Sequence, residues 1–267
     1  MLETMRDVRP LKTATAARWS AVLLAIALCA APEAIFAQHA AFRIKGRVKT
    51  DAGDPVAGAT VRAEAFFGYA AGTFAGQRVF TVDTNAKGDW SIGALQPGVW
   101  MFTVTSADYL PEIVVLPPRL LATVSQGTSG LSLPWDLILK PLKVPDSDRG
   151  KVLTAAAKAA QDGHADDARS ALQSTPETAD ADFLAAAGRI ALVANDPALA
   201  STLFQKAIGI DPSSYRATLG LASTFLLQRD FDSASRAFDA ARNRTHDKDE
   251  QRFISAALGE LANIKVR

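Results

Sequence analysis

The chain has 267 residues and a formal net charge of +1, with 48% hydrophobic and 21% charged residues. The apolar fraction is enough to form hydrophobic cores, which excludes a chain that is disordered over most of its length. The length allows one large domain or two small ones. The near-zero net charge argues against nucleic acid as a partner, because binding to phosphates needs clustered lysine and arginine.

Residues 1–37 have the order of a secretory signal peptide. A basic leader precedes an uncharged apolar stretch over residues 21–31, which is shorter than the roughly 20 residues that span a bilayer. We expect cleavage after Ala37 and a periplasmic or secreted mature chain without a membrane span. The alternative is an uncleaved anchor, because Ile35 and Phe36 lengthen the apolar segment.

Cys29 is the sole cysteine and lies within this leader. A lipoprotein signal would place a small residue directly before the cysteine, whereas Leu28 stands there, so we expect no lipid anchor. The mature chain would then contain no disulfide, no thiolate metal ligand and no cysteine nucleophile.

Residues 41–141 consist of short apolar alternations separated by glycine, proline, asparagine and aspartate. Trp100, Phe102 and Val104, for example, recur at every second position. This period, with turn residues between the runs, predicts an antiparallel β-sandwich in which one row of side chains is buried and the other is in water. Further strands are expected over residues 79–84, 113–116 and 137–139.

Two strings of residues in this region follow a family pattern. The first is Ile44-x-Gly46-x-Val48 with Asp51-x-Gly53-x-Pro55-Val56-x-Gly58-Ala59-x-Val61, and the second is Thr84-x-x-x-Gly88-x-Trp90-x-Ile92 with Leu95-x-Pro97-Gly98-x-Trp100-x-Phe102-x-Val104. Both resemble the carboxypeptidase regulatory-like domain. The resemblance implies a transthyretin-like β-sandwich that serves as an accessory module outside the cytoplasm, without peptidase chemistry. It also implies carbohydrate binding as a further property, because the wider superfamily includes glycan-binding relatives.

A glycine- and aromatic-rich loop over residues 66–76 is longer than a minimal sandwich requires. In one interpretation Phe66, Tyr69 and Phe74 form a ligand platform, because flat aromatic faces stack on sugar rings or on partner side chains. In the other, Phe67 and Phe74 pack under the edge of the sandwich while the glycines permit the bend.

No pattern of a catalytic, metal or cofactor site stands out. Residues 83–88 have the spacing of a calcium loop, but Lys87 stands at a ligand position, so we expect a hairpin turn. His39, His164 and His246 lack the spacing of metal ligands and are not near a Gly-x-Ser-x-Gly turn. We therefore expect no cofactor and no enzymatic activity.

Alanine becomes frequent after a polar, proline-flanked linker at residues 142–148, and the apolar period changes to that of helices. Ala181 aligns with Tyr215 at a spacing of 34 residues. Packing positions then coincide, namely Gly188 with Ala222, Ala200 with Ala234, Phe204 with Phe238, and Ala207 with Ala241.

These positions resemble the tetratricopeptide repeat, in which small residues let two antiparallel helices approach and one aromatic fills the gap. A degenerate unit from Arg149 precedes the two aligned units, and a final helix over residues 249–264 follows them. We therefore expect an all-α solenoid of about three repeats with a capping helix over residues 149–267.

The resemblance implies a concave groove lined by the first helix of each pair. The groove positions carried over to this chain include Asp182, Arg189, Arg216, Leu219, Ser223 and Phe253. Two arginines among apolar neighbours would grip a peptide carboxylate or an acidic side chain. The full carboxylate clamp of the family is not present, because its lysine and asparagine are missing. The alternative is that Arg189 and Arg216 are solvated.

Together these features predict an exported, non-catalytic interaction or scaffold protein that binds a protein or peptide partner through its repeats. Two alternatives remain at this point. One is a carbohydrate-binding module that acts through the sandwich, and the other is an accessory subunit of an envelope complex.

Overall fold

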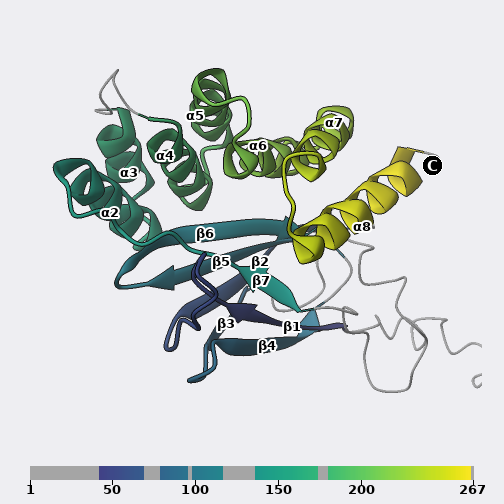
Figure 1. Cartoon of the computed structure of the whole chain (residues 1–267), viewed down its shortest axis with the longest axis horizontal. Helices are drawn as coiled ribbons and strands as arrows, with labels where there is room; N and C mark the ends of the chain where they lie inside the picture. The colour runs from purple at the N-terminus through teal and green to yellow at the C-terminus, as the bar shows by residue number, and fades with distance from the viewer. Residues whose placement is uncertain (1–41, 69–78, 96–97, 117–135, 174–179, 266–267) are drawn as a thin grey trace, which may run out of the picture. The chain divides into compact units, whose positions relative to one another are not determined.

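A computed structural model describes residues 42–68, 79–95, 98–116, 136–173 and 180–265. These residues lie in one compact unit, Ala40–Arg267. They form a β region of two sheets followed by seven helices (Figure 1). Among the helices of the described ranges, none combines the length and the apolar character needed to cross a bilayer.

Seven strands make up the two sheets, in the orders β4-β1-β7 and β3-β2-β5-β6. Their bounds are β1 (Phe42–Val48), β2 (Thr60–Gly68), β3 (Val79–Asp83), β4 (Asp89–Leu95), β5 (Gly98–Ser106), β6 (Tyr109–Leu116) and β7 (Leu137–Leu139). The predicted sandwich of strands is confirmed with one exception, because β7 pairs parallel with β1. Strands in parallel cannot be joined by a short hairpin, and here strands β2 to β6 lie between β1 and β7 in the chain.

Aromatic residues fill the space between the sheets. The ring centroids of Trp90 and Phe102 are 5.6 Å apart, and those of Phe80 and Trp100 are 5.8 Å apart. Trp100 and Phe102 are 1% and 0% exposed, which confirms the inward row predicted for β5. Such tilted aromatic pairs bury large apolar areas, so they account for much of the core of the β region.

The turn at residues 84–88 differs from the predicted hairpin, because β3 and β4 belong to different sheets. Asn85 Oδ1 accepts hydrogen bonds from the N–H groups of Lys87 and Asp89, at 2.8 and 3.0 Å. Gly88 has a φ of +74°, a conformation that favours glycine. The turn therefore carries the chain from one layer of the sandwich to the other.

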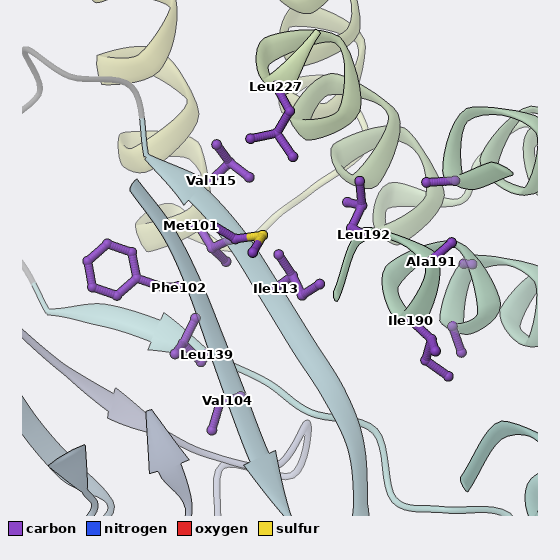
Figure 2. Packing of buried hydrophobic residues seen from close by; sticks show 14 of the residues in the cluster. Met101, Phe102, Val104, Ile113, Val115, Leu139, Ile190, Ala191, Leu192 and Leu227 are labelled. Carbon is purple, nitrogen blue, oxygen red and sulfur yellow. The ribbon is translucent and has the colours of Figure 1, made fainter. Parts of the chain in front are cut away.

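The second row of side chains on β5 is buried as well, so the prediction of a wet outer row is wrong for this strand. Met101 and Thr103 are 4% and 5% exposed. In Figure 2, Met101 and Ile113 lie on the side of the sheet nearer to Leu192, whereas Phe102 lies on the other side. The physical reason is that helices cover this face, and the sequence pattern of a single strand does not reveal such a cover.

The helices form three antiparallel pairs and a final helix (Figure 1). Their bounds are α2 (Asp148–Gln161), α3 (Ala165–Gln173), α4 (Ala181–Val193), α5 (Pro197–Ile210), α6 (Tyr215–Leu227), α7 (Phe231–Arg242) and α8 (Lys248–Lys265). The turns within the pairs contain Gly163, Asn195 and Arg229, with φ values of +82°, +57° and +62°. These left-handed residues end the first helix of each pair and allow the second to fold back.

The aromatic of the repeat acts as a wedge between successive helix pairs. Phe204 on α5 is 0% exposed. A Cβ atom on Gly220 of α6 would lie 2.3 Å from the ring of Phe204, and one on Gly188 of α4 would lie 2.8 Å from it. Only glycine fits at these two positions beside the ring. This explains why the repeat has small residues on the first helix of a pair and an aromatic residue on the second.

Asp196 caps α5 and also pairs with the preceding helix pair. Its Oδ1 accepts the N–H of Leu199 at 3.0 Å, and its Oδ2 accepts from Arg169 Nε at 2.7 Å. The N–H of Leu199, followed by Arg169, holds the pKa of Asp196 below its ordinary value of 3.8. We expect Asp196→Ala to lower the free energy of unfolding by about 1 kcal/mol at neutral pH.

The pH dependence of this effect has a defined sign. Because the pKa is lower in the folded state, the contribution of the carboxylate is present above 3.8 and is lost as the pH falls below it. Asp196→Asn keeps a capping oxygen that does not titrate in this range. Denaturant unfolding at neutral and at acidic pH should therefore show wild type and Asp196→Asn converging in acid. A difference that does not change with pH would contradict this assignment.

Candidate partner-binding site

The first helices of the repeats contact the strands of the same chain. Helices α2, α4 and α6 contact β6, the edge strand of its sheet, and α8 contacts β7. The segment predicted as a linker lies beside β6, because Leu142 O accepts from Leu110 N at 2.7 Å and Val144 N donates to Asp108 O at 3.0 Å. The helices expected to line an open groove thus have the sandwich beside them.

Glu112 of β6 lies between the two arginines predicted to hold a carboxylate. Its Oε2 is 3.5 Å from Arg189 Nε and 3.6 Å from Arg216 Nη1. Arg189 is 3% exposed, so the alternative of a solvated arginine is wrong for this residue. Arg216 also donates to Lys140 O at 3.0 Å and to Asp51 Oδ1 at 2.5 Å. The pair of arginines therefore contacts an acidic side chain that belongs to the chain itself.

This ion pair is buried, and three of its polar atoms lack hydrogen bonds in the described part of the chain. Within the described residues, Glu112 Oε2 and Arg189 Nε and Nη2 have no hydrogen-bond partner. Burial raises the pKa of Glu112, an effect that Arg189 and Arg216 oppose, and burial lowers the pKa of Arg189. Unsatisfied buried polar atoms are uncommon in folded proteins, so this cluster calls for an explanation.

A cavity of about 370 Å³ adjoins the cluster, between α4, α6 and α8 on one side and β6 and β7 on the other. Four of the six residues predicted for the groove line it: Arg189, Arg216, Leu219 and Phe253. Asp182 is exposed and Ser223 is 3% exposed, and neither lines this cavity.

Acidic groups outnumber basic groups in the cavity lining. The six carboxylates belong to Asp51, Glu112, Asp136, Asp247, Asp249 and Glu250. The three cations belong to Lys140, Arg189 and Arg216. Lys140 Nζ lies 2.7 Å from Asp247 Oδ2 and 3.1 Å from Glu250 Oε1, and these hydrogen bonds raise the pKa of Lys140 against the opposing effect of its burial.

Sequence reasoning did not find Glu112, Lys140 or Asp247, which come from the β region and from the turn before the last helix. One sequence feature could have pointed to Glu112, because it is a lone acid in the apolar run of β6. A charged residue within such a run is costly to bury unless a partner meets it. Lys140 and Asp247 have no comparable local pattern.

Other predicted residues lie elsewhere. Tyr69, Phe74 and residues 1–37 are outside the described residues, and Phe66 belongs to β2 without a described side chain. His164 and His246 are exposed. In the described part of the chain, no group of three or more histidine, cysteine or acidic side chains is arranged to hold a metal ion.

The fold therefore defines a two-part protein, a β-sandwich followed by tetratricopeptide-like helix pairs. Comparison with known families gives the same order. Residues 43–125 match the family model of the carboxypeptidase regulatory-like domain, and residues 191–257 match that of the tetratricopeptide repeat. Both resemblances seen in the sequence are thereby confirmed. A search of curated protein sequences found no match.

Several solved structures are similar to less than half of this chain. The type III secretion chaperone SycD of Yersinia enterocolitica, in complex with a peptide of the translocator YopD, is 17% identical with a TM-score of 0.38, over 43% of this chain and 92% of its own. PcrH of Pseudomonas aeruginosa is 18% identical with a TM-score of 0.37, over 45% of this chain and 94% of its own.

Catechol 1,2-dioxygenase of Acinetobacter radioresistens is 10% identical with a TM-score of 0.33, over 41% of this chain and 54% of its own. The chain thus spans about half the length of this enzyme.

Proposed function

We propose that the chain is a non-catalytic interaction protein that binds a segment of a protein partner in the cavity between its repeats and its own sandwich. The observation that carries this proposal is the cavity itself. It is lined by α4, α6 and α8, which carry the groove positions implied by the resemblance to tetratricopeptide repeats. The strands β6 and β7 contact these helices beside the cavity but do not fill it.

The lining of the cavity combines apolar and polar groups. Leu219, Tyr215 and Phe253 supply apolar surface from α6 and α8, and Ile138 supplies it from β7. A volume of about 370 Å³ is at the lower end of the range for ligand pockets. Such a site suits one long side chain of a partner together with a short stretch of its backbone.

Export is part of this proposal. It is supported by the order of charges and apolar residues in 1–37, and cleavage after Ala37 would leave Gln38 as the first residue. The proposal does not include glycan binding, because the aromatic side chains that suggested it are not among those described. A scaffold that holds a partner needs no reactive group of its own.

A photo-crosslinking amino acid at Asp249 tests the proposal in the native cell. Asp249 lines the cavity, and its side chain is 36% exposed at the start of α8. We expect this position to give a discrete crosslinked protein. The matched control at Lys206, which is exposed on α5 and does not line the cavity, should give none.

Mass spectrometry of the same sample identifies both the partner and the first residue of the chain. No adduct at Asp249, or equal adducts at both positions, would count against binding in the cavity. A chain that retains residues 1–37 would overturn the cleavage, and turnover of a substrate by the purified chain would overturn the non-catalytic role.

A further inference from the structure

We infer that the partner segment places a lysine or arginine side chain in this cavity. The inference rests on the proposed function and goes further by naming the chemistry of the partner. It reverses the expectation from the sequence, in which Arg189 and Arg216 bind an acidic segment.

Each cation of the cavity already has a carboxylate beside it. Arg189 faces Glu112, Arg216 faces Glu112 and Asp51, and Lys140 lies between two acids of the α8 region. An acidic segment would have to displace one of these carboxylates. It would also approach the carboxylates that line the rest of the cavity, which repel it.

The charged groups that line the cavity are mostly acidic. Asp136 is contacted from outside the lining by Lys45 at 3.7 Å and by Arg47 at 3.4 Å, and Asp249 is contacted by Arg252. Within the lining itself, the carboxylates still outnumber the cations. Three of these carboxylates act on Tyr215, whose pKa is raised first by burial and then by Glu250, Glu112 and Asp247, while Arg216 opposes the shift. A negative potential of this kind favours a cation at the site.

The lining also contains side-chain atoms without a hydrogen-bond partner among the described residues. Glu112 is 8% exposed, and its Oε2 is buried and accepts no hydrogen bond, so a ligand donor that enters beside it would satisfy it. An ammonium or guanidinium group supplies such a donor. Arg189 Nη2 is an unused donor on the same lining, which the carbonyl oxygen of a peptide would satisfy.

A basic peptide segment supplies both groups at once, the donors from its side chain and the acceptor from its backbone. A free metal cation supplies no acceptor, and an acidic segment supplies no donor from its side chain. The apolar residues Leu219 and Phe253 would pack along the methylene groups of the entering lysine or arginine.

Selection from a phage-displayed library of random peptides on the immobilised full chain tests this inference. We expect the selected peptides to be enriched in lysine or arginine and to bind less well at high salt. Leu219→Trp, which fills the cavity, should abolish binding. Leu221→Trp on the same helix is the control that should preserve binding, because Leu221 does not line the cavity.

Glu250→Gln should weaken the best peptide by about tenfold, since one charged acceptor is lost while Asp247 still holds Lys140. Thermal unfolding followed by circular dichroism shows whether the variant is folded, and Asp249→Asn replaces it if it is not. Peptides that bind in the cavity but are acidic or neutral would overturn the inference and leave the proposed function in place. A library that yields no cavity-dependent peptide would overturn both.

Discussion

Glu112→Ala is expected to lower the free energy of unfolding by about 3–5 kcal/mol. The substitution leaves Arg189 as a charge that is 3% exposed, with no carboxylate at 3.5 Å. A buried charge without a counter-ion is far more costly than the loss of an exposed ion pair. Equilibrium unfolding in denaturant, followed by circular dichroism, measures the difference from wild type.

Two controls separate charge from packing. The exposed pair of Arg62 and Glu64 has an N–O distance of 2.5 Å, and Glu64→Ala should cost less than about 1 kcal/mol. The double variant Glu112→Leu with Arg189→Leu removes both buried charges, so it should be near wild type or more stable. If Glu112→Ala costs no more than Glu64→Ala, or if the double variant is as unstable as the single one, this reading of the ion pair is wrong.

This ion pair could not be predicted from the sequence, whereas patterns within single elements could. Periodicity within one element predicted the strands of the sandwich and the inward Trp100 and Phe102, because alternation follows directly from the geometry of a strand. The predicted groove residues Arg189 and Arg216 both approach Glu112 in the structure for a similar reason, since a repeat places the groove positions of successive first helices on one surface.

What periodicity could not predict is the packing of one part of the chain against the other. The alternation in β5 predicts that Met101 and Thr103 face solvent, yet both are buried where helices cover the sheet. Glu112 meets Arg189 across 77 positions of sequence, and no local pattern connects them. The sequence likewise predicts a domain boundary at the linker of residues 142–148, whereas the backbone of this linker forms hydrogen bonds with Asp108 and Leu110. Each of these features depends on contacts between elements that were predicted separately.

This packing also limits where a partner can bind. A tetratricopeptide-like groove is ordinarily a surface for ligands, but here α4 and α6 contact β6. The cavity beside α8 is a part of that surface that the sandwich does not fill, and side chains of both the sandwich and the helices line it. Because Glu112 belongs to β6 and lies beside arginines on α4 and α6, a ligand bound there would contact both regions at once. The strength of ligand binding would then depend on how firmly the two regions are packed.

Phe204→Ala is expected to lower the free energy of unfolding by about 3–5 kcal/mol, because the ring is fully buried and its removal leaves a cavity. The ring contacts the backbone positions Gly188 and Gly220, which belong to different helix pairs. In repeat proteins the interfaces between neighbouring units carry much of the stability. We therefore expect hydrogen exchange to increase in both α4 and α6, not only in α5.

Ile210→Ala on the same helix is the control, since Ile210 is 56% exposed and its loss should change stability by no more than about 0.5 kcal/mol. Phe238→Ala removes the equivalent aromatic of the next unit, on α7. It should cost as much as Phe204→Ala but increase exchange in α6 and α8 more than in α4, because the wedge is one unit further along the chain. Equal exchange in α4 for both variants would mean that the helices unfold as one body and that Phe204 does not act as a local wedge.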